Sequence, residues 1–138
     1  MGRRGVFVAD LLSDLFARLR NGQAARRVSV TAPYSGLSAA VVGVLAGQGF
    51  VRGARALELR AGVRELEVFL KYDEEGVGAI RKLRRVSKPS RRVSARLRDL
   101  PRASRGLGCW ILSTSRGVMH CARARELGVG GEILGEVL

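Results

Sequence analysis

The chain has few of the residues from which catalytic and metal sites are usually built. Its 138 residues include a single histidine, His120, and two cysteines, Cys109 and Cys121. Two cysteines are too few for a disulfide framework and favour a reducing compartment. They lie twelve positions apart, which is poor spacing for metal ligands, so we expect core or edge thiols. We therefore predict no catalytic residue, no metal and no cofactor.

Long apolar runs and nucleotide-binding motifs are also missing. No stretch approaches the roughly 20 apolar residues that a transmembrane helix needs, so no membrane span is predicted. Gly106-Leu107-Gly108 is too short for a dinucleotide loop, no Walker pattern occurs, and no small-molecule substrate is expected. The basic opening, Met1–Val8, is too short for a secretory signal, and the stub of an organelle-targeting segment remains an alternative.

Aromatic residues are scarce as well, at 5% of the chain, whereas hydrophobic residues reach 46%. The core must therefore be aliphatic, and wholesale disorder is excluded. The length suits one ordinary domain or two very small ones.

What the chain does have is positive charge. Lysine and arginine number 25 against 12 acidic residues, which gives a net charge of +13. Such an excess favours a polyanionic partner, with nucleic acid as the first choice and a membrane surface as the second. All but three of the cations are arginines, whose planar guanidinium grips phosphate and stacks on bases. Codon usage in a GC-rich genome explains the preference for arginine equally well, but it does not explain the net charge.

The spacing of apolar residues predicts an α+β first domain over residues 1–80. Its expected order is α-β-α-β-β-β. The elements are a helix over about 9–20 stopped by Asn21-Gly22, a strand over 28–32, a helix capped by Ser35 and ended by Gly47 and Gly49, a strand from Phe50, and two strands, 57–60 and 65–70, joined by a turn at Ala61-Gly62.

A basic segment, Arg81–Arg98, marks the boundary to a second domain over residues 81–138. It holds nine cations and no acid, so binding to RNA would release many counterions. The alternative is a solvated face or a linker, although such faces normally mix charges of both signs. The rest of this domain is predicted to be mainly β with one short helix: strands at 109–112, near 118 and at 132–138, and a helix over 122–127.

Two polar features stand out in the second domain. Ser113-Thr114-Ser115 places three hydroxyls between an apolar strand and the Arg116-Gly117 turn, which suits base edges, 2′-hydroxyls and phosphates. On spacing alone, a polar strand end is the simpler interpretation. Glu132 follows Gly130-Gly131, and its carboxylate can orient an arginine or a hydroxyl, or accept from a base amine. The alternative is an ordinary glutamate on a strand surface.

The order of these motifs resembles the small-subunit ribosomal protein eight family over about Ala9 to Leu138. The motifs that carry the resemblance are Leu19-Arg20-Asn21-Gly22, Val30-Thr31-Ala32-Pro33, Gly49-Phe50-Val51, Leu70-Lys71-Tyr72, Arg85-Val86-Ser87-Lys88-Pro89, Leu100-Pro101, Gly106-Leu107-Gly108, Leu112–Met119 and Leu127–Ile133. The last two are highly specific when they occur together.

The resemblance implies a two-domain, non-enzymatic protein that binds the central domain of small-subunit rRNA beside neighbouring small-subunit ribosomal proteins and supports subunit assembly. RNA recognition falls mainly on the second domain, with added contacts from the first. The candidate RNA-binding residues are Ser113, Thr114, Ser115, Arg116, Gly117, Glu132, Arg85, Lys88, Arg91, Arg92, Thr31 and Ser35. The alternative function is a translational repressor or a general RNA-binding module outside the ribosome.

The sequence departs from the family pattern at three places. An aromatic of the interdomain segment is replaced by Ser94, the acidic opening before the first helix is absent, and Cys109 and Trp110 are bulkier than usual. Such drift favours an organellar ribosome, and we predict a mitochondrial one. A bacterial cytoplasm or a plastid is the alternative.

Overall fold

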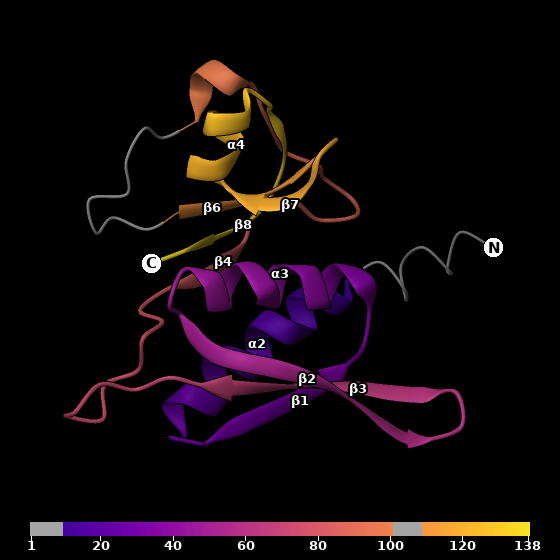
Figure 1. Ribbon diagram of the computed structural model, residues 1–138, viewed down its shortest axis with the longest axis vertical. Coiled ribbons are helices and arrows are strands. Elements are labelled where there is room, and N and C mark those ends of the chain that lie inside the picture. Colours follow the sequence, from indigo (N-terminus) through magenta and orange to yellow (C-terminus); the bar gives the residue numbers. More distant parts are fainter. Residues whose placement is uncertain (1–9, 101–108) are drawn as a thin grey trace. The chain divides into compact units, whose positions relative to one another are not determined.

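The computed structural model describes residues 10–100 and 109–138, so the Met1–Val8 stretch, Pro101 and the Gly106–Gly108 motif lie outside it. The α+β class is confirmed (Figure 1). The chain forms two compact units, one over Leu11–Arg81 and one over Lys82–Leu138, which also includes Asp10. Within residues 10–100 and 109–138, no helix is long and apolar enough to cross a membrane.

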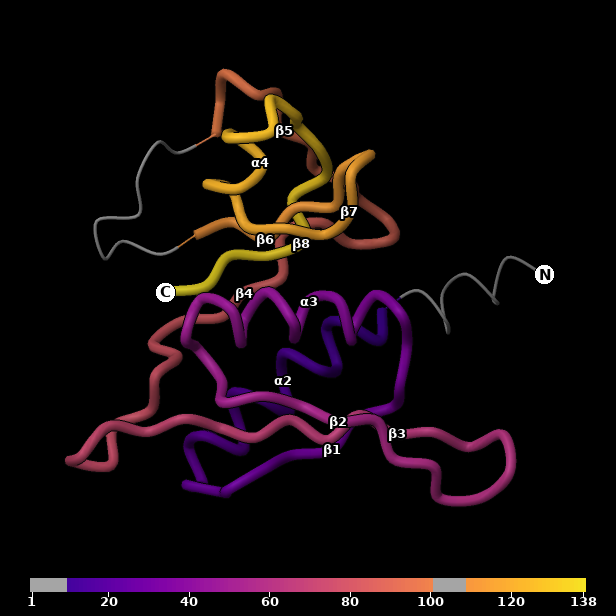
Figure 2. The backbone as a smooth tube through the Cα atoms, in the orientation of Figure 1, coloured from indigo at the N-terminus to yellow at the C-terminus, as the bar shows by residue number. Residues whose placement is uncertain are grey.

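The first unit is a three-stranded antiparallel sheet covered on one face by two helices. Its elements are α2 (Leu11–Ala24), β1 (Ser29–Pro33), α3 (Gly36–Gly47), β2 (Val51–Arg60) and β3 (Val63–Leu70), with strand order β1-β3-β2. Figure 2 shows both helices on the same side of this sheet. The aliphatic core lies between the layers, where Leu15, Phe16, Leu19, Val41, Leu45 and Val68 are fully buried.

Two local signals of the first unit are confirmed. Ser35 caps α3, because its Oγ accepts a hydrogen bond from the backbone N–H of Ser38 at 3.0 Å. The turn at Ala61-Gly62 joins β2 to β3, and Gly62 has the φ of +78° that a side chain would disfavour.

Two expectations for the first unit are wrong. The helix α2 continues past Asn21-Gly22 to Ala24, because Gly22 provides close packing instead of a stop: a Cβ there would collide with Val30 on β1. The order is α-β-α-β-β, one strand fewer than predicted in the described part of this unit. The residues from Val51 to Arg60 form one continuous strand, β2, paired along β3 with two irregularities.

The second unit is mainly β with one short helix, as predicted. Its elements are β4 (Leu83–Arg85), β5 (Ser94–Ala95), the 3-10 helix η1 (Leu97–Asp99), β6 (Cys109–Thr114), β7 (Gly117–His120), α4 (Cys121–Leu127) and β8 (Gly131–Val137). The antiparallel sheet has the order β4-β8-β6-β7, and β5 also pairs with β8. Its core includes Ile111, Leu112, Ala124 and Val137, all fully buried.

Candidate nucleic-acid interface

A row of polar side chains crosses the sheet of the second unit. Glu132 of β8 lies directly opposite Ser94 of β5 and Ser113 of β6. Residues paired across strands share a face, and successive residues alternate between faces. The neighbouring row, Leu112 and Ile133, is buried, so Ser94, Glu132 and Ser113 face away from the core.

The two glycines before Glu132 allow the strands to approach closely. A Cβ at Gly130 would lie 2.5 Å from the carbonyl oxygen of Ala95, and one at Gly131 would collide with the carbonyl oxygen of Ser113. The Gly-Gly-Glu motif is therefore a packing requirement, because only hydrogen atoms fit between β8 and its neighbours at these positions.

Glu132 orients an arginine of the basic segment, one of the roles considered for it from the sequence. Its Oε1 accepts a hydrogen bond from Nη1 of Arg92 at 3.1 Å. The Arg92 side chain is 72% exposed whereas that of Glu132 is 24% exposed. Most of the guanidinium therefore stays open to an anion while one of its edges is held by the carboxylate.

The hairpin between β6 and β7 presents the Ser-Thr-Ser motif, but its hydroxyls do different things. Thr114 Oγ1 donates to the carbonyl of Gly117 at 2.8 Å and accepts from the N–H of Arg116 at 3.0 Å. Thr114 thus fixes the turn, where Gly117 has a φ of +112°. Ser115 and Arg116 are exposed at the tip, and Ser113 lies in the polar row.

The basic segment is part of the sheet of the second unit, which makes the linker interpretation wrong. The fully buried Ser87 donates through Oγ to the carbonyl of Val93 at 3.0 Å and accepts from the Val93 N–H at 2.8 Å. Inside this closure, Lys88 and Arg91 exchange two backbone hydrogen bonds of 2.9 Å. The short loop between Ser87 and Val93 therefore displays Lys88, Arg91 and Arg92, all exposed, from a fixed base.

Arg85 differs from the other predicted cations. Its side chain is only 10% exposed, and it donates from Nη1 to the carbonyl of Leu134 at 2.8 Å and from Nε to Asp10 at 3.3 Å. The structure therefore does not present Arg85 on the open surface with Arg91 and Arg92.

The two candidates of the first unit occupy the ends of one short segment. Thr31 lies on β1 opposite Glu67, and its carbonyl accepts from Nη1 of Arg18 at 2.9 Å. Ser35 is engaged as the cap of α3, which leaves its hydroxyl proton to donate.

The two cysteines are buried, and the histidine caps a helix. Cys109 and Cys121 are buried free thiols, as expected, and burial, with a smaller effect of Cys121, raises the pKa of Cys109 to about 11. His120 is the N-cap of α4, where Nδ1 accepts from the Arg123 N–H at 3.3 Å. Over residues 10–100 and 109–138, no group of three or more His, Cys, Asp or Glu side chains could hold a metal ion.

Some features of the interface were missed from the sequence. Ser87 gave no signal, because its partner Val93 lies across a loop whose closure depends on the sheet. Ser94 was noted only as a lost aromatic, yet it lies opposite Glu132. The alternating pattern of the strands could have placed Ser94, Glu132 and Ser113 on one face only if the register had been known.

A fixed basic loop beside a polar row on one sheet face, in a chain of net charge +13, is typical of small α+β proteins that bind structured RNA. Comparison with known proteins gives the family. The model of the family described as ribosomal protein S8 matches residues 10–138. The chain therefore belongs to the ribosomal protein S8 family.

Individual relatives align with this chain over nearly the full length of both proteins. The small ribosomal subunit protein uS8 of Rhodospirillum centenum is 48% identical over 130 residues, which cover 94% of this chain and 98% of the relative. Those of Paramagnetospirillum magneticum and Rhizorhabdus wittichii are 49% and 51% identical with the same coverage.

Proposed function

We propose that this chain is a structural, non-enzymatic constituent of the small ribosomal subunit, where it binds the central domain of the rRNA and contacts neighbouring small-subunit proteins. Membership of the ribosomal protein S8 family supports the ribosomal role. The observation that carries the RNA site is the polar row Ser94–Glu132–Ser113 beside the loop that holds Arg92. Hydroxyls and a carboxylate on an open sheet face can read the edges and 2′-hydroxyls of a folded RNA.

Different residues of the site contribute to the affinity and to the specificity of RNA binding. Lys88, Arg91 and Arg92 bind phosphates from the loop closed by Ser87, and this contribution weakens with salt. Ser113, Ser115 and Glu132 read the shape and polar groups of the RNA. Thr114 and Gly117 act through the turn, and Arg85 acts through its bonds to Leu134 and Asp10.

The test uses the full chain and a transcript of the central domain of its own small-subunit rRNA. Changing Ser113 and Ser115 together to Ala is expected to cost about 1–3 kcal/mol of binding free energy, because polar partners on the RNA are left unpaired. Changing Gln48, an exposed polar residue of the first unit, to Ala is the control. Affinity of the double variant within twofold of the parent chain would rule out this site, and equal affinity for transcripts of other rRNA domains would rule out central-domain recognition.

The compartment of the ribosome is a separate question. Relatives from bacteria, at 48% and 49% identity over almost their whole length, support a ribosome of bacterial type, the alternative to the mitochondrial localisation predicted above. The mitochondrial localisation stays a prediction. Fractionation of cells that express the tagged chain, followed by sedimentation at high salt, tests both points: a subunit protein co-migrates with small subunits, and an RNA-binding module outside the ribosome does not.

A further inference from the structure

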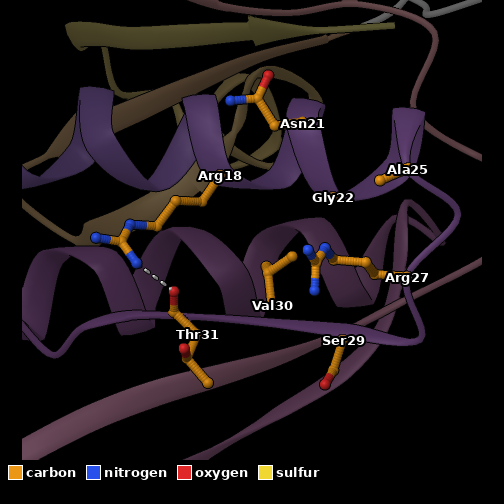
Figure 3. A pocket seen from close by; sticks show the side chains of 8 residues that line it. All are labelled: Arg18, Asn21, Gly22, Ala25, Arg27, Ser29, Val30 and Thr31. Atoms are coloured by element: carbon orange, nitrogen blue, oxygen red, sulfur yellow. Dashed lines mark hydrogen bonds between the residues drawn. The ribbon is translucent and has the colours of Figure 1, made fainter.

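A groove runs between α2 and β1 of the first unit. It has a volume of about 520 Å³, which is in the usual range for ligand sites. Figure 3 shows its lining, which consists of Arg18, Asn21, Gly22, Ala25, Arg27, Ser29, Val30 and Thr31. Two of the lining residues, Gly22 and Val30, are in close contact. In Figure 3 the Arg18 guanidinium lies next to Thr31, and the Arg27 guanidinium lies next to Val30.

The backbone of Arg27 is held by hydrogen bonds, whereas its side chain forms no ion pair with any described residue. Its N–H donates to the carbonyl of Gly22 at 2.9 Å, and its carbonyl accepts from the Tyr72 hydroxyl at 2.6 Å. No hydrogen bond or ion pair joins the exposed Arg27 side chain to any residue within 10–100 or 109–138. The groove therefore contains a guanidinium on a fixed backbone, with five N–H donors that no residue of the described part of the chain occupies.

Arg18 completes the cationic lining. It donates from Nε to Asp14 at 3.0 Å and from Nη1 to the Thr31 carbonyl at 2.9 Å, which leaves three of its five N–H donors. Asp14 balances its charge. Glu67, which lies opposite Thr31 on β3, is already bonded to Arg55 and Ser29. Of the two arginines that line the groove, Arg18 therefore has an ion-pair partner, and Arg27 has none within residues 10–100 and 109–138.

We infer that the groove between α2 and β1 binds a phosphodiester segment of RNA, with Arg27 as the principal phosphate ligand and the remaining donors of Arg18 as the second. The groove belongs to the first unit, whereas the polar row belongs to the second. The inference rests on the proposed function. A guanidinium binds phosphate with two parallel hydrogen bonds. Two such groups that line one open groove fit a chain of linked phosphates.

The first experiment measures binding of the full chain to the central-domain transcript as a function of salt. Changing Arg27 to Ala is expected to weaken binding about threefold to tenfold and to lower the slope of log K against log salt by roughly one. Arg60, exposed on β2 of the same unit, is the charge-matched control when changed to Ala. A second pair of variants, both at Ala25, distinguishes the effect of charge from that of side-chain size. Ala25→Glu should weaken binding strongly, and Ala25→Gln, of equal size, should not.

The second measurement locates the RNA. An iron chelate that generates hydroxyl radicals is tethered through Ala25→Cys, since the native cysteines are buried, and it should cut one confined stretch of the transcript. The same probe tethered through Arg60→Cys should not cut that stretch. If Arg27→Ala and Ala25→Glu bind like their controls while the Ser113 and Ser115 changes weaken binding, the groove inference fails and the proposed function stands. If the parent chain shows no preference for the transcript, both fail.

Discussion

Arg92 and Glu132 are forty positions apart in the chain and are joined by a hydrogen bond of 3.1 Å. The bond connects the basic loop, at the residue before Val93, to β8, a strand in the middle of a sheet. Since the arginine is mostly exposed, this ion pair contributes little to folding, as is usual for surface pairs. Its effect is to orient a guanidinium at Glu132, the central residue of the polar row.

A double-mutant cycle tests this relationship. Glu132→Gln and Arg92→Ala should each weaken binding to the central-domain transcript by about 1–2 kcal/mol, and together by less than the sum, because both act on one contact. Binding is measured by fluorescence anisotropy. Glu126→Gln, an exposed position on α4, is the control and should bind like the parent chain. Strict additivity would contradict the orienting role of Glu132.

The second prediction concerns the close approach at Gly131. Adding a Cβ here meets the carbonyl of Ser113, so Gly131→Ala should force β6 and β8 apart and lower the free energy of unfolding by about 1–3 kcal/mol. Urea unfolding monitored by circular dichroism measures the change. Gly53 on β2 has no atom within 4 Å of an added Cβ, so Gly53→Ala should be close to neutral. A Gly131→Ala variant as stable as Gly53→Ala would contradict the packing role.

Substitutions at Thr114 are expected to change the stability of the fold, and a substitution at Ser115 is expected to change RNA binding. Thr114→Val removes both hydrogen bonds of the turn and should cost about 1–2 kcal/mol of unfolding free energy, while Thr114→Ser keeps the hydroxyl and most of the stability. Ser115→Ala should leave the unfolding free energy unchanged and weaken RNA binding. Thermal melts and binding assays on the three variants give the comparison. Unchanged stability in Thr114→Val would show that the hydroxyl does not fix the turn.

Glu67 gives a prediction for acid stability. Hydrogen bonds from Arg55 and then Ser29 hold the pKa of Glu67 below its ordinary value of 4.5. A carboxylate with a lowered folded pKa stabilises the fold above its unfolded pKa, and this contribution is lost as the pH falls through the folded pKa. Glu67→Gln should therefore lower the melting temperature at pH 7 and reduce its dependence on pH below about 4.5. Glu58→Gln, at an exposed position on β2, is the control and should leave the melting temperature at pH 7 unchanged.

The thiol of Cys109 gives a prediction about chemical reactivity. Burial raises its pKa to about 11, so the reactive thiolate is scarce at pH 8. Alkylation by iodoacetamide should be slow in the folded chain and fast in urea. A folded-state rate equal to that of the unfolded chain would show that the thiol is accessible.

Short-range signals predicted much of this fold, and long-range contacts account for the errors. The Ser35 cap and the Gly62 turn depend on bonds between near neighbours, and both are confirmed. Gly22 was interpreted as a stop, because its real partner, Val30, lies on the following strand. The candidate site has the same limit: the residue types at 113–115 and 132 were visible in the sequence, whereas their alignment with Ser94 depends on strand register.

The closure of the basic loop by Ser87 has a thermodynamic consequence. Arginine-rich segments that are disordered when free must give up conformational freedom when they bind RNA. Here the buried Ser87 hydroxyl and the paired Lys88 and Arg91 backbones have already fixed the path of the chain during folding. Calorimetry should therefore show a smaller entropic cost of association for this chain than for a free peptide of residues 81–98 on the same RNA.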